Sequence, residues 1–265
     1  MRLAAVRGRG VDGMDLNNSV IAITGAGQGL GQMMAVTLAQ AGADLALIDF
    51  NEEGLKETQK QCQMLSAKAL IYKADVSNEV QVEIAFEQIV ADFGQLNGLV
   101  NNAGVLRDGL LVKVKDGELT KMPLEQFNTV MNVNVTGTFL CGREAAASMI
   151  ELGNQGVIIN ISSVARAGNI GQTNYSASKA AVATLAVCWA KELGRYGIRA
   201  AAVAPGIVHT AMADQLKPEA IDRLKQMVPL SRMGEASEIA HAVKFIFEND
   251  YFTGRVLEVD GGMRM

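Results

Sequence analysis

Cysteine and histidine are scarce in this chain of 265 residues, which contains three cysteines and two histidines. Cys62, Cys141 and Cys188 show no CxxC spacing, and His209 and His241 are far apart in the sequence. A disulfide framework needs paired cysteines, and a zinc site needs clustered cysteine and histidine ligands. Neither is expected, so no metal site is predicted and the cysteines are interpreted as small buried apolar residues.

The sequence also lacks a basic run and an apolar run long enough to span a membrane. Its formal net charge is -4, so neither a nucleic-acid partner nor a membrane partner is expected. Residues 1–13 have no apolar signal-peptide core, carry three arginines, and precede a plausible second start at Met14. We expect a flexible N-terminal tail, with an organelle-targeting peptide as the alternative, and a cytoplasmic protein.

Hydrophobic residues make up 49% of the chain, and there are 27 glycines but only four prolines. This length and composition suffice for one large core, so residues 14–265 are expected to form a single α/β domain.

A glycine-rich turn follows the first apolar run. Val20 to Thr24 is a predicted strand, the turn has the spacing TGxxxGxG, and a helical pattern begins with Met33 and Met34. Glycines let the backbone approach a pyrophosphate closely, and the start of a helix offers unpaired N–H groups. The turn is therefore a candidate dinucleotide-binding site.

Asp49 ends the second predicted strand, about twenty residues past this turn. A carboxylate there can accept hydrogen bonds from an adenosine ribose and would repel a 2′-phosphate, which favours NAD over NADP. Gln28 supports NAD because a basic residue at that position would be the natural phosphate partner. The alternative is that Asp49 only caps the helix that starts near Asn51.

Polar and small side chains follow two further strands. Asp75 could meet the adenine edge or cap the helix that begins near Glu79. Asn101 to Gly104, with the sequence NNAG, follows the strand that ends with Leu99 and Val100. Such residues suit a backbone that passes close to a ligand and needs its polar groups fixed.

In Val112 to Met122, segments in which apolar and polar residues alternate flank Asp116-Gly117. An Asp-Gly pair between such segments is a strong signal for a hairpin with a two-residue turn. The expected register places Lys115 opposite Glu118. We predict a protruding hairpin near the carboxyl ends of the strands, which either rims the substrate entrance or touches another subunit.

Pro123 to Leu152 is predicted to be one long, bent helix with Asn134 in its middle. A buried amide without partners costs about 1–3 kcal/mol. Either a bound water reaching toward Lys179 satisfies it, or the amide bonds only within its own helix.

Ser162 and Ser163 follow a β-branched run, Val157 to Ile161, that predicts a central strand. A hydroxyl there can hold a substrate carbonyl. In the next helix Tyr175 and Lys179 are four residues apart, hence on one face. A cation beside a phenol favours phenolate, so the sequence predicts that Lys179 lowers the pKa of Tyr175 toward the working range.

Taken in order, the motifs TGxxxGxG, NNAG, NVTG, the Ser-Ser strand end, YSASK, PGIVHT and VDGG make Leu16 to Met263 resemble the short-chain dehydrogenase/reductase family. The resemblance implies a catalytic set of Asn134, Ser163, Tyr175 and Lys179. The residues that it implies at the cofactor are Gly25, Gln28, Gly29, Leu30, Gly31, Asp49, Asp75, Val76, Asn101, Ala103, Gly104, Tyr175, Lys179, Pro205, Gly206, Ile207 and Thr210. The gap from Ser163 to Tyr175 is one residue shorter than usual in the family, and Ser162 would fit; Ser163 is favoured because the loop Val164 to Thr173 can absorb a deletion.

The resemblance also implies a reaction. Ser163 would hold the carbonyl oxygen, Tyr175 would transfer the proton, and Lys179 would bind the nicotinamide ribose. The motifs are most similar to those of 3-oxoacyl-thioester reductases, with acyl-carrier protein or CoA as the carrier. The alternatives are an NAD-dependent dehydrogenase of another secondary alcohol (hydroxyacyl-CoA, sugar or steroid) and a non-catalytic cofactor-binding sensor.

The expected architecture is a doubly wound Rossmann fold. Its seven-stranded, largely parallel sheet has the order third, second, first, fourth, fifth, sixth, seventh, with helices on both faces. The segment at about 208–230, with apolar residues at helical spacing, is interpreted as a lid. A homotetramer is expected from the resemblance.

Overall fold

The computed structural model describes residues 13–209 and 218–264. The predicted tail therefore lies outside the described residues except for Gly13, and so do Thr210 and part of the predicted lid.

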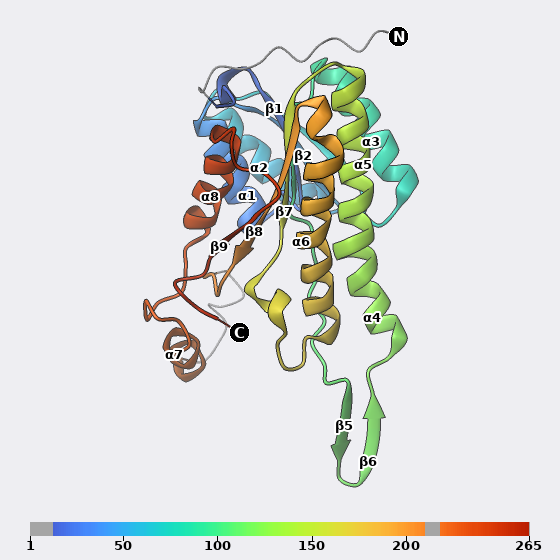
Figure 1. The fold of residues 1–265 in the computed structure, drawn as a ribbon, viewed down its shortest axis with the longest axis vertical. Coiled ribbons are helices and arrows are strands. Elements are labelled where there is room, and N and C mark those ends of the chain that lie inside the picture. Colours follow the sequence, from blue (N-terminus) through green and yellow to red (C-terminus); the bar gives the residue numbers. More distant parts are fainter. Residues whose placement is uncertain (1–12, 210–217, 265) are drawn as a thin grey trace.

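A seven-stranded parallel sheet forms the centre of the molecule (Figure 1). Its order is β3-β2-β1-β4-β7-β8-β9, which confirms the predicted order once the two hairpin strands are set aside. The strands are β1 (Val20–Thr24), β2 (Asp44–Asp49), β3 (Ala69–Lys73), β4 (Gly98–Asn101), β7 (Gly156–Ile161), β8 (Ile198–Pro205) and β9 (Val256–Val259). The chain leaves β1 in one direction for β2 and β3 and returns on its other side with β4. In such sheets a ligand binds at this switch point, at the carboxyl ends of the strands.

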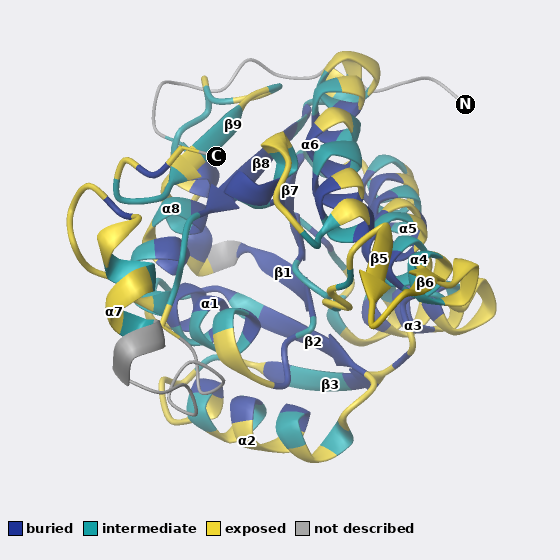
Figure 2. Cartoon of the chain, turned by 90° about the horizontal axis from the view of Figure 1, so that it is seen from below, coloured by how far each residue is buried: buried dark blue, intermediate teal, exposed yellow. Residues whose placement is uncertain are grey.

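Helices cover both faces of the sheet (Figure 2). On one face lie α1 (Gly29–Gln40), α2 (Glu52–Gln63) and α8 (Ala236–Glu248); on the other lie α3 (Glu79–Phe93), α5 (Gly137–Glu151) and α6 (Thr173–Leu193). Each face of the sheet packs against its helices in a separate hydrophobic core. Successive residues of a strand contribute to different cores, because strand side chains alternate between the two faces. In β1, Ile21 and Ile23 pack into the core beneath α1, whereas Val20 and Ala22 pack into the other. The predicted doubly wound fold is confirmed.

The predicted long helix is interrupted. α4 (Leu124–Met131) and α5 are joined by a π-helical turn, Asn132–Thr136, that contains Asn134. π-Turns inside helices widen the backbone locally and occur often at functional sites.

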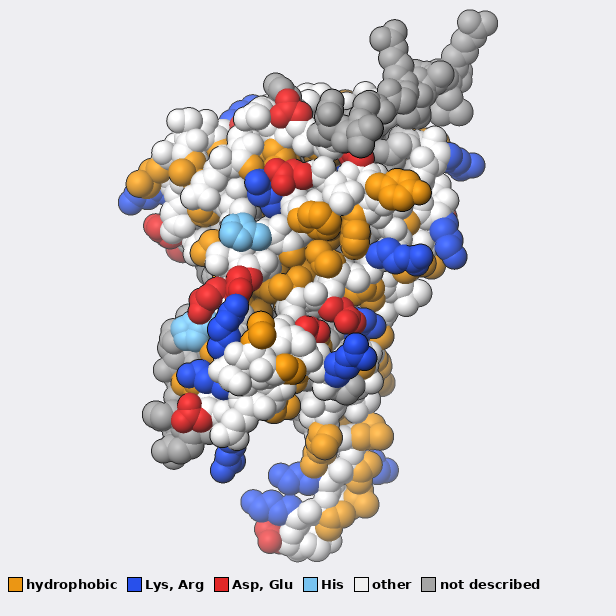
Figure 3. Space-filling model, turned by 60° about the vertical axis from the view of Figure 1, so that its left-hand side comes forward, with side chains coloured by type: hydrophobic (Ala, Val, Ile, Leu, Met, Phe, Trp, Pro, Cys, Tyr) orange, Lys and Arg blue, Asp and Glu red, His pale blue; other side chains and the backbone are white. Residues whose placement is uncertain are grey.

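A hairpin of β5 (Val112–Lys115) and β6 (Glu118–Lys121) protrudes at the end where α4 begins (Figure 1). Its register pairs Lys115 with Glu118, as predicted. Asp116 and Gly117 both have positive φ (54° and 83°), which the two-residue turn requires. All eight strand residues are exposed, and Figure 3 shows apolar side chains gathered along one side of the hairpin, with basic side chains mainly along the other.

Past β8, the described part of the predicted lid contains α7 (Pro218–Gln226). Beyond it, Val228 is buried against Ile207, Val164 and Met263. Within 13–209 and 218–264, no helix combines the length and apolar character needed to cross a membrane.

Candidate active site

The glycine turn after β1 is held against the end of β4. Oγ1 of Thr24 accepts hydrogen bonds from the backbone N–H groups of Asn102 and Ala103, both 3.0 Å long. The side-chain Nδ2 of Asn102 in turn donates to the backbone carbonyl oxygens of Thr24 and Gly25, at 3.1 Å each. A Cβ on Gly31 would lie 2.0 Å from the carbonyl oxygen of Gly25, so only glycine fits. These contacts between Thr24 and the end of β4 could not be predicted from the sequence, because nothing local shows that the two segments meet.

Helix α1 begins in this turn, at Gly29. Gln28 occupies the N-cap position but makes no capping hydrogen bond with its side chain. The first N–H groups of the helix therefore remain available, at the positive end of the helix dipole. Gln28 and Gly29 are exposed, and together with Leu30 they line a cavity. These features suit a bound pyrophosphate.

Asp49 closes the other side of this turn. Its Oδ2 accepts from the N–H of Gly27 and its Oδ1 from the N–H of Asn51, both at 2.9 Å. The helix cap is Asn51 itself, whose Oδ1 accepts from Gly54, so the capping alternative for Asp49 is wrong. A carboxylate can accept about four hydrogen bonds. Asp49 is buried, but because it accepts only these two bonds from backbone N–H groups, it can still accept hydrogen bonds from a ligand in the cavity that it lines.

Asp75 and Val76 line the same cavity. Oδ1 of Asp75 accepts from the N–H and hydroxyl of Ser77, at 2.9 and 2.7 Å. Helix α3 is capped by Asn78, whose Oδ1 accepts from Gln81. Of the two alternatives for Asp75, helix capping is therefore ruled out.

The cavity has a volume of about 860 Å³, within the range of cofactor and ligand sites. From the glycine turn it runs past Asp49 and Asp75 to Gly104, Val105 and Val133. Its shape and lining fit a dinucleotide: glycine backbone and a helix start at one end, a carboxylate at the adenosine side. Asn101 does not line it. This side chain is buried and donates to Oδ1 of Asn160 on β7 at 3.0 Å, while its own Oδ1 has no hydrogen-bond partner. Asn102, one residue on, lines the cavity instead.

Tyr175 and Lys179 lie on one face of α6, as predicted: Nζ of Lys179 is 5.6 Å from the centre of the Tyr175 ring. Lys179 is buried, with 5% of its surface exposed, and its ammonium donates to the carbonyl oxygen of Ile161 at 2.8 Å. A Cβ on Gly104 would lie 3.5 Å from the same Nζ. Gly104 lines one end of the cavity, so Lys179 lies close to a lining residue without lining the cavity itself.

The predicted effect of this pairing on Tyr175 is wrong. Burial raises the pKa of Tyr175, a hydrogen bond with Ser163 lowers it, and the charge of Asp108 raises it; the net direction is upward. Burial likewise lowers the pKa of Lys179 to about 8. Both changes have one cause, because removal from water disfavours whichever form is charged. The direction of the Tyr175 pKa shift is decided by how deeply the phenol is packed, and residue spacing alone does not predict that burial.

The two serines at the end of β7 have different surroundings. Ser162 is buried and its hydroxyl donates to the backbone carbonyl of Lys179 at 2.7 Å. The hydroxyl of Ser163 accepts from the N–H of Ala165 at 3.1 Å and lies near enough to the phenol of Tyr175 to lower its pKa. Only Ser163 therefore presents its hydroxyl beside the phenol.

Asn134 is buried in the π-turn and bonds outside its own helix. Its Oδ1 accepts from the N–H of Val105 at 2.8 Å, and its Nδ2 donates to the carbonyl of Val105 and to Oγ of Ser178, at 3.1 and 3.0 Å. Neither sequence-based alternative describes these contacts. Asn134 connects the loop after β4 to α6.

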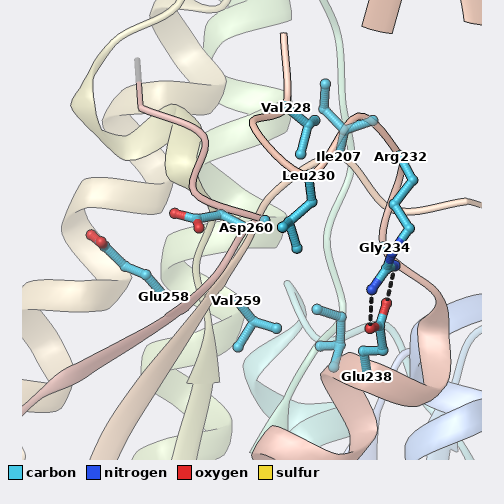
Figure 4. A pocket seen from close by; sticks show the side chains of 11 residues that line it. Ile207, Val228, Leu230, Arg232, Gly234, Glu238, Glu258, Val259 and Asp260 are labelled. Atoms are coloured by element: carbon cyan, nitrogen blue, oxygen red, sulfur yellow. Dashed lines mark hydrogen bonds and ion pairs between the residues drawn. The ribbon is translucent and has the colours of Figure 1, made fainter. Parts of the chain in front are cut away.

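Pro205 and Gly206 lie at the end of β8, where a Cβ on Gly206 would be 2.7 Å from Cα of Asp260. Ile207 follows and borders a second, smaller cavity of about 260 Å³ (Figure 4). The charges there are paired: Arg232 makes two hydrogen bonds with Glu238, at 2.8 and 2.7 Å, and Glu258 pairs with Arg166. Pro205, Gly206 and Ile207, which the resemblance places at the cofactor, thus lie at the carboxyl end of the sheet.

Ser163, Tyr175 and Lys179 do not themselves line the cavity. A switch-point cavity with a glycine turn, together with a tyrosine and a lysine on one face of the helix after the serine strand end, is typical of the class of nicotinamide-dependent oxidoreductases. A family model described as enoyl-(acyl carrier protein) reductase matches residues 25–264. The chain belongs to the short-chain dehydrogenase/reductase family, and it is an oxidoreductase acting on CH–OH and C=O groups.

Several relatives match over nearly their whole length. The chain is 38% identical to the 3-oxoacyl-[acyl-carrier-protein] reductase FabG of Thermotoga maritima, over 94% of this chain and 99% of that protein. It is 36% identical to the (3R)-3-hydroxyacyl-CoA dehydrogenase of Rattus norvegicus, over 94% and 98%. A crystal structure of NAD+-bound xylitol dehydrogenase superposes with a TM-score of 0.84 at 30% identity and covers 93% of this chain and 99% of that chain.

Proposed function

We propose that this protein reduces 3-oxoacyl thioesters to 3-hydroxyacyl thioesters with NADH. The observation that carries the proposal is the arrangement of Tyr175 and Lys179 on one face of α6, with Nζ of Lys179 5.6 Å from the centre of the Tyr175 ring and 3.5 Å from where a Cβ on Gly104, which lines the cavity, would lie. The names of the reductase and hydroxyacyl-CoA dehydrogenase relatives support a 3-oxoacyl or 3-hydroxyacyl thioester as the reactant.

In the proposed reaction Ser163 holds the carbonyl oxygen and Tyr175 donates a proton to it. The nicotinamide cofactor, when bound, supplies a hydride to the carbonyl carbon, so the C=O bond becomes a CH–OH group. The raised pKa of Tyr175 supports this direction, since a phenol that keeps its proton is ready to donate it. Lys179, which lies next to Gly104, would hold the nicotinamide ribose, and Asn134 holds the loop after β4 in place through Val105.

Asp49 supports NAD as the preferred cofactor. Its carboxylate is buried against the glycine turn and lines the cavity at the side where the adenosine ribose would lie. A 2′-phosphate at that position would meet a negative charge with little water to screen it. The fit to an NAD+-bound relative points the same way.

The thioester carrier could be acyl-carrier protein or CoA. Acyl-carrier protein is a macromolecular partner, whereas CoA is a small molecule. Arg166 is already paired with Glu258, which leaves Arg195 as the arginine of the two that has no carboxylate partner among the ion pairs of the described residues and could meet a carrier protein. An NAD-dependent dehydrogenase of another secondary alcohol, such as a hydroxyacyl-CoA, a sugar or a steroid, is the second candidate. A homotetramer and a cytoplasmic location remain predictions from the sequence.

Steady-state kinetics test the proposal. NADH and NADPH are each assayed with acetoacetyl-CoA, an acyl-carrier-protein thioester and simple ketones, in the wild type and in Tyr175→Phe. The expected result is turnover of the thioesters with NADH preferred, and loss of turnover in the variant. A strong preference for NADPH would overturn the role of Asp49. Tight NADH binding without turnover of any carbonyl or alcohol would indicate a non-catalytic sensor instead.

A further inference from the structure

The first turn of α6 contains Tyr175 and lacks an ordinary side-chain cap. Gln172 occupies the N-cap position but makes no capping hydrogen bond with its side chain. The N–H of Ser176 donates back to the carbonyl of Gln172, at 2.7 Å. Tyr175 precedes Ser176, so its N–H is one of the first N–H groups of the helix, which have no partner within the helix. A side chain other than the cap must therefore accept from it.

Asn174 is that acceptor, although it lies inside the helix. The side chain is fully buried, and its Oδ1 accepts from the N–H of Tyr175 at 2.8 Å. Its Nδ2 donates to the backbone carbonyl of Arg107 at 2.9 Å and lies 3.4 Å from that of Gln126. One amide thus joins the backbone of Tyr175 to the loop after β4 and to α4.

This loop leads from the cavity to Asn174. Gly104 and Val105, at its start, line the cavity. Asn134 binds both backbone polar groups of Val105. Two residues further on, the carbonyl of Arg107 accepts from Asn174. The backbone of Tyr175 is therefore held relative to the wall of the cavity through a short, hydrogen-bonded stretch of chain.

We propose that Asn174 is a positioning residue for the reaction: by bonding the N–H of Tyr175 and the carbonyl of Arg107 at once, it fixes the first turn of α6, and with it the phenol, relative to the cavity. The inference rests on the proposed role of Tyr175. Asn174 does not line the cavity, so its loss should slow the chemical step rather than weaken cofactor binding. A shift of a reacting group by about 1 Å can lower the rate by about 10²-fold.

The first test compares Asn174→Ala with Gln126→Ala. Nε2 of Gln126 donates to the same carbonyl of Arg107, at 3.0 Å, and to that of Asp108, at 3.1 Å. Gln126→Ala is the matched control, because it removes an amide from the same loop and leaves the bond to Tyr175 in place. We expect Asn174→Ala to lower kcat by roughly ten- to a hundredfold without a matching rise in Kd for NADH, measured by fluorescence. Gln126→Ala should keep kcat within about twofold of the wild type.

Asn174→Asp gives a readout that a loss of stability alone would not give. An ionised carboxylate can accept from the N–H of Tyr175 but cannot donate to the carbonyl of Arg107, whereas the protonated acid can do both. The kcat of Asn174→Asp relative to that of Asn174→Ala should therefore rise as the pH falls from about 9 to about 6, because a buried carboxyl has a raised pKa.

The ratio of the two variants cancels the titration of the neighbouring charged residues, which both proteins retain. On the elements joined by Asn174 these are Arg107 and Asp108 on the loop, Glu125 on α4 and Lys179 on α6. If Asn174→Ala does not fold, the wild type replaces it as the reference.

Tyr175→Phe separates this inference from the function beneath it. If Tyr175→Phe abolishes turnover, the role of Asn174 alone is overturned by any of three results: kcat of Asn174→Ala equals that of Gln126→Ala, Kd for NADH rises as much as kcat falls, or the ratio for Asn174→Asp does not change with pH. If Tyr175→Phe keeps full turnover, the proposed function fails, and the inference fails with it.

Discussion

The hydroxyl of Ser162 donates to the backbone carbonyl of Lys179 at 2.7 Å, so this serine joins the end of β7 to the middle of α6. Ser163, its neighbour, lies near enough to Tyr175 to lower the pKa of the phenol. The count of residues to Tyr175 leaves both serines possible; their surroundings distinguish them, because the hydroxyl of Ser162 is buried and bonded to backbone.

Replacing each serine should separate the two roles. Ser163→Ala should lower kcat by about 10²- to 10³-fold with little change in stability, because it removes the donor for the carbonyl oxygen. Ser162→Ala should keep most of the activity but lose about 1 kcal/mol of the free energy of unfolding, through the lost bond to Lys179. Turnover and urea unfolding of both variants measure this. A larger loss of kcat in Ser162→Ala would reverse the assignment.

Lys179 should make stability depend on pH. Burial lowers its pKa from 10.5 to about 8, so below pH 8 the folded state carries a buried ammonium that the unfolded state keeps in water. Between pH 8 and 10.5 the folded protein releases that proton while the unfolded chain retains it, and stability rises with pH. The free energy of unfolding of the wild type, relative to Lys179→Met, should therefore increase by about 3 kcal/mol across this range.

The difference between the two proteins cancels other groups that titrate at alkaline pH. Urea unfolding at intervals from pH 7 to pH 10 measures it. A constant difference would mean that the folded and unfolded states bind the proton of Lys179 equally well.

Asp49→Asn tests cofactor choice. The substitution keeps one oxygen that can accept from Gly27 or Asn51 but removes the negative charge that a 2′-phosphate would meet. We expect the ratio of KM for NADPH to KM for NADH to fall by roughly tenfold. Asp75→Asn, in the same cavity but bonded to Ser77, is the control and should leave the ratio unchanged. Equal effects in both variants would attribute cofactor choice to the overall charge of the cavity.

Local patterns in the sequence predicted the fold because each depends on near neighbours. The glycine turn and the hairpin register at Asp116-Gly117 follow from residues a few positions apart. The partners of Asn134 could not be predicted, since Val105 and Ser178 are 29 and 44 residues away. The direction of the Tyr175 pKa was missed for the same reason, because burial by packing outweighs a neighbour on the same helix.

Gly31 and Gly29 should respond differently to alanine. A Cβ on Gly31 would lie 2.0 Å from the carbonyl oxygen of Gly25, which is backbone and cannot move away alone. Gly31→Ala should therefore abolish detectable NADH binding, measured by fluorescence. At Gly29 a Cβ meets nothing within 4 Å, but φ is +57°, so Gly29→Ala should cost about 1 kcal/mol of folding free energy. Gly153→Ala, also open and at φ +69° but far along the chain from the turn, controls for backbone strain and should bind NADH normally.

The hairpin should be dispensable for folding. An isolated pair of strands is marginally stable in water, and here Val112, Val114 and Leu119 are all exposed on its apolar side, at 49%, 67% and 59%. Because the N–H of Met122 donates to the carbonyl of Leu111, a short Gly-Ser link in place of residues 112–121 can close the base. We expect the free energy of unfolding to change by less than about 0.5 kcal/mol, as for other exposed surfaces. If the hairpin rims the substrate entrance, its deletion should raise KM for long acyl thioesters. If the hairpin touches another subunit, its deletion should weaken the assembly, so that subunits already separate at higher protein concentrations in sedimentation. A deletion that leaves kinetics and assembly unchanged would rule out both roles, and a loss of several kcal/mol would mean that the hairpin is part of the folded core.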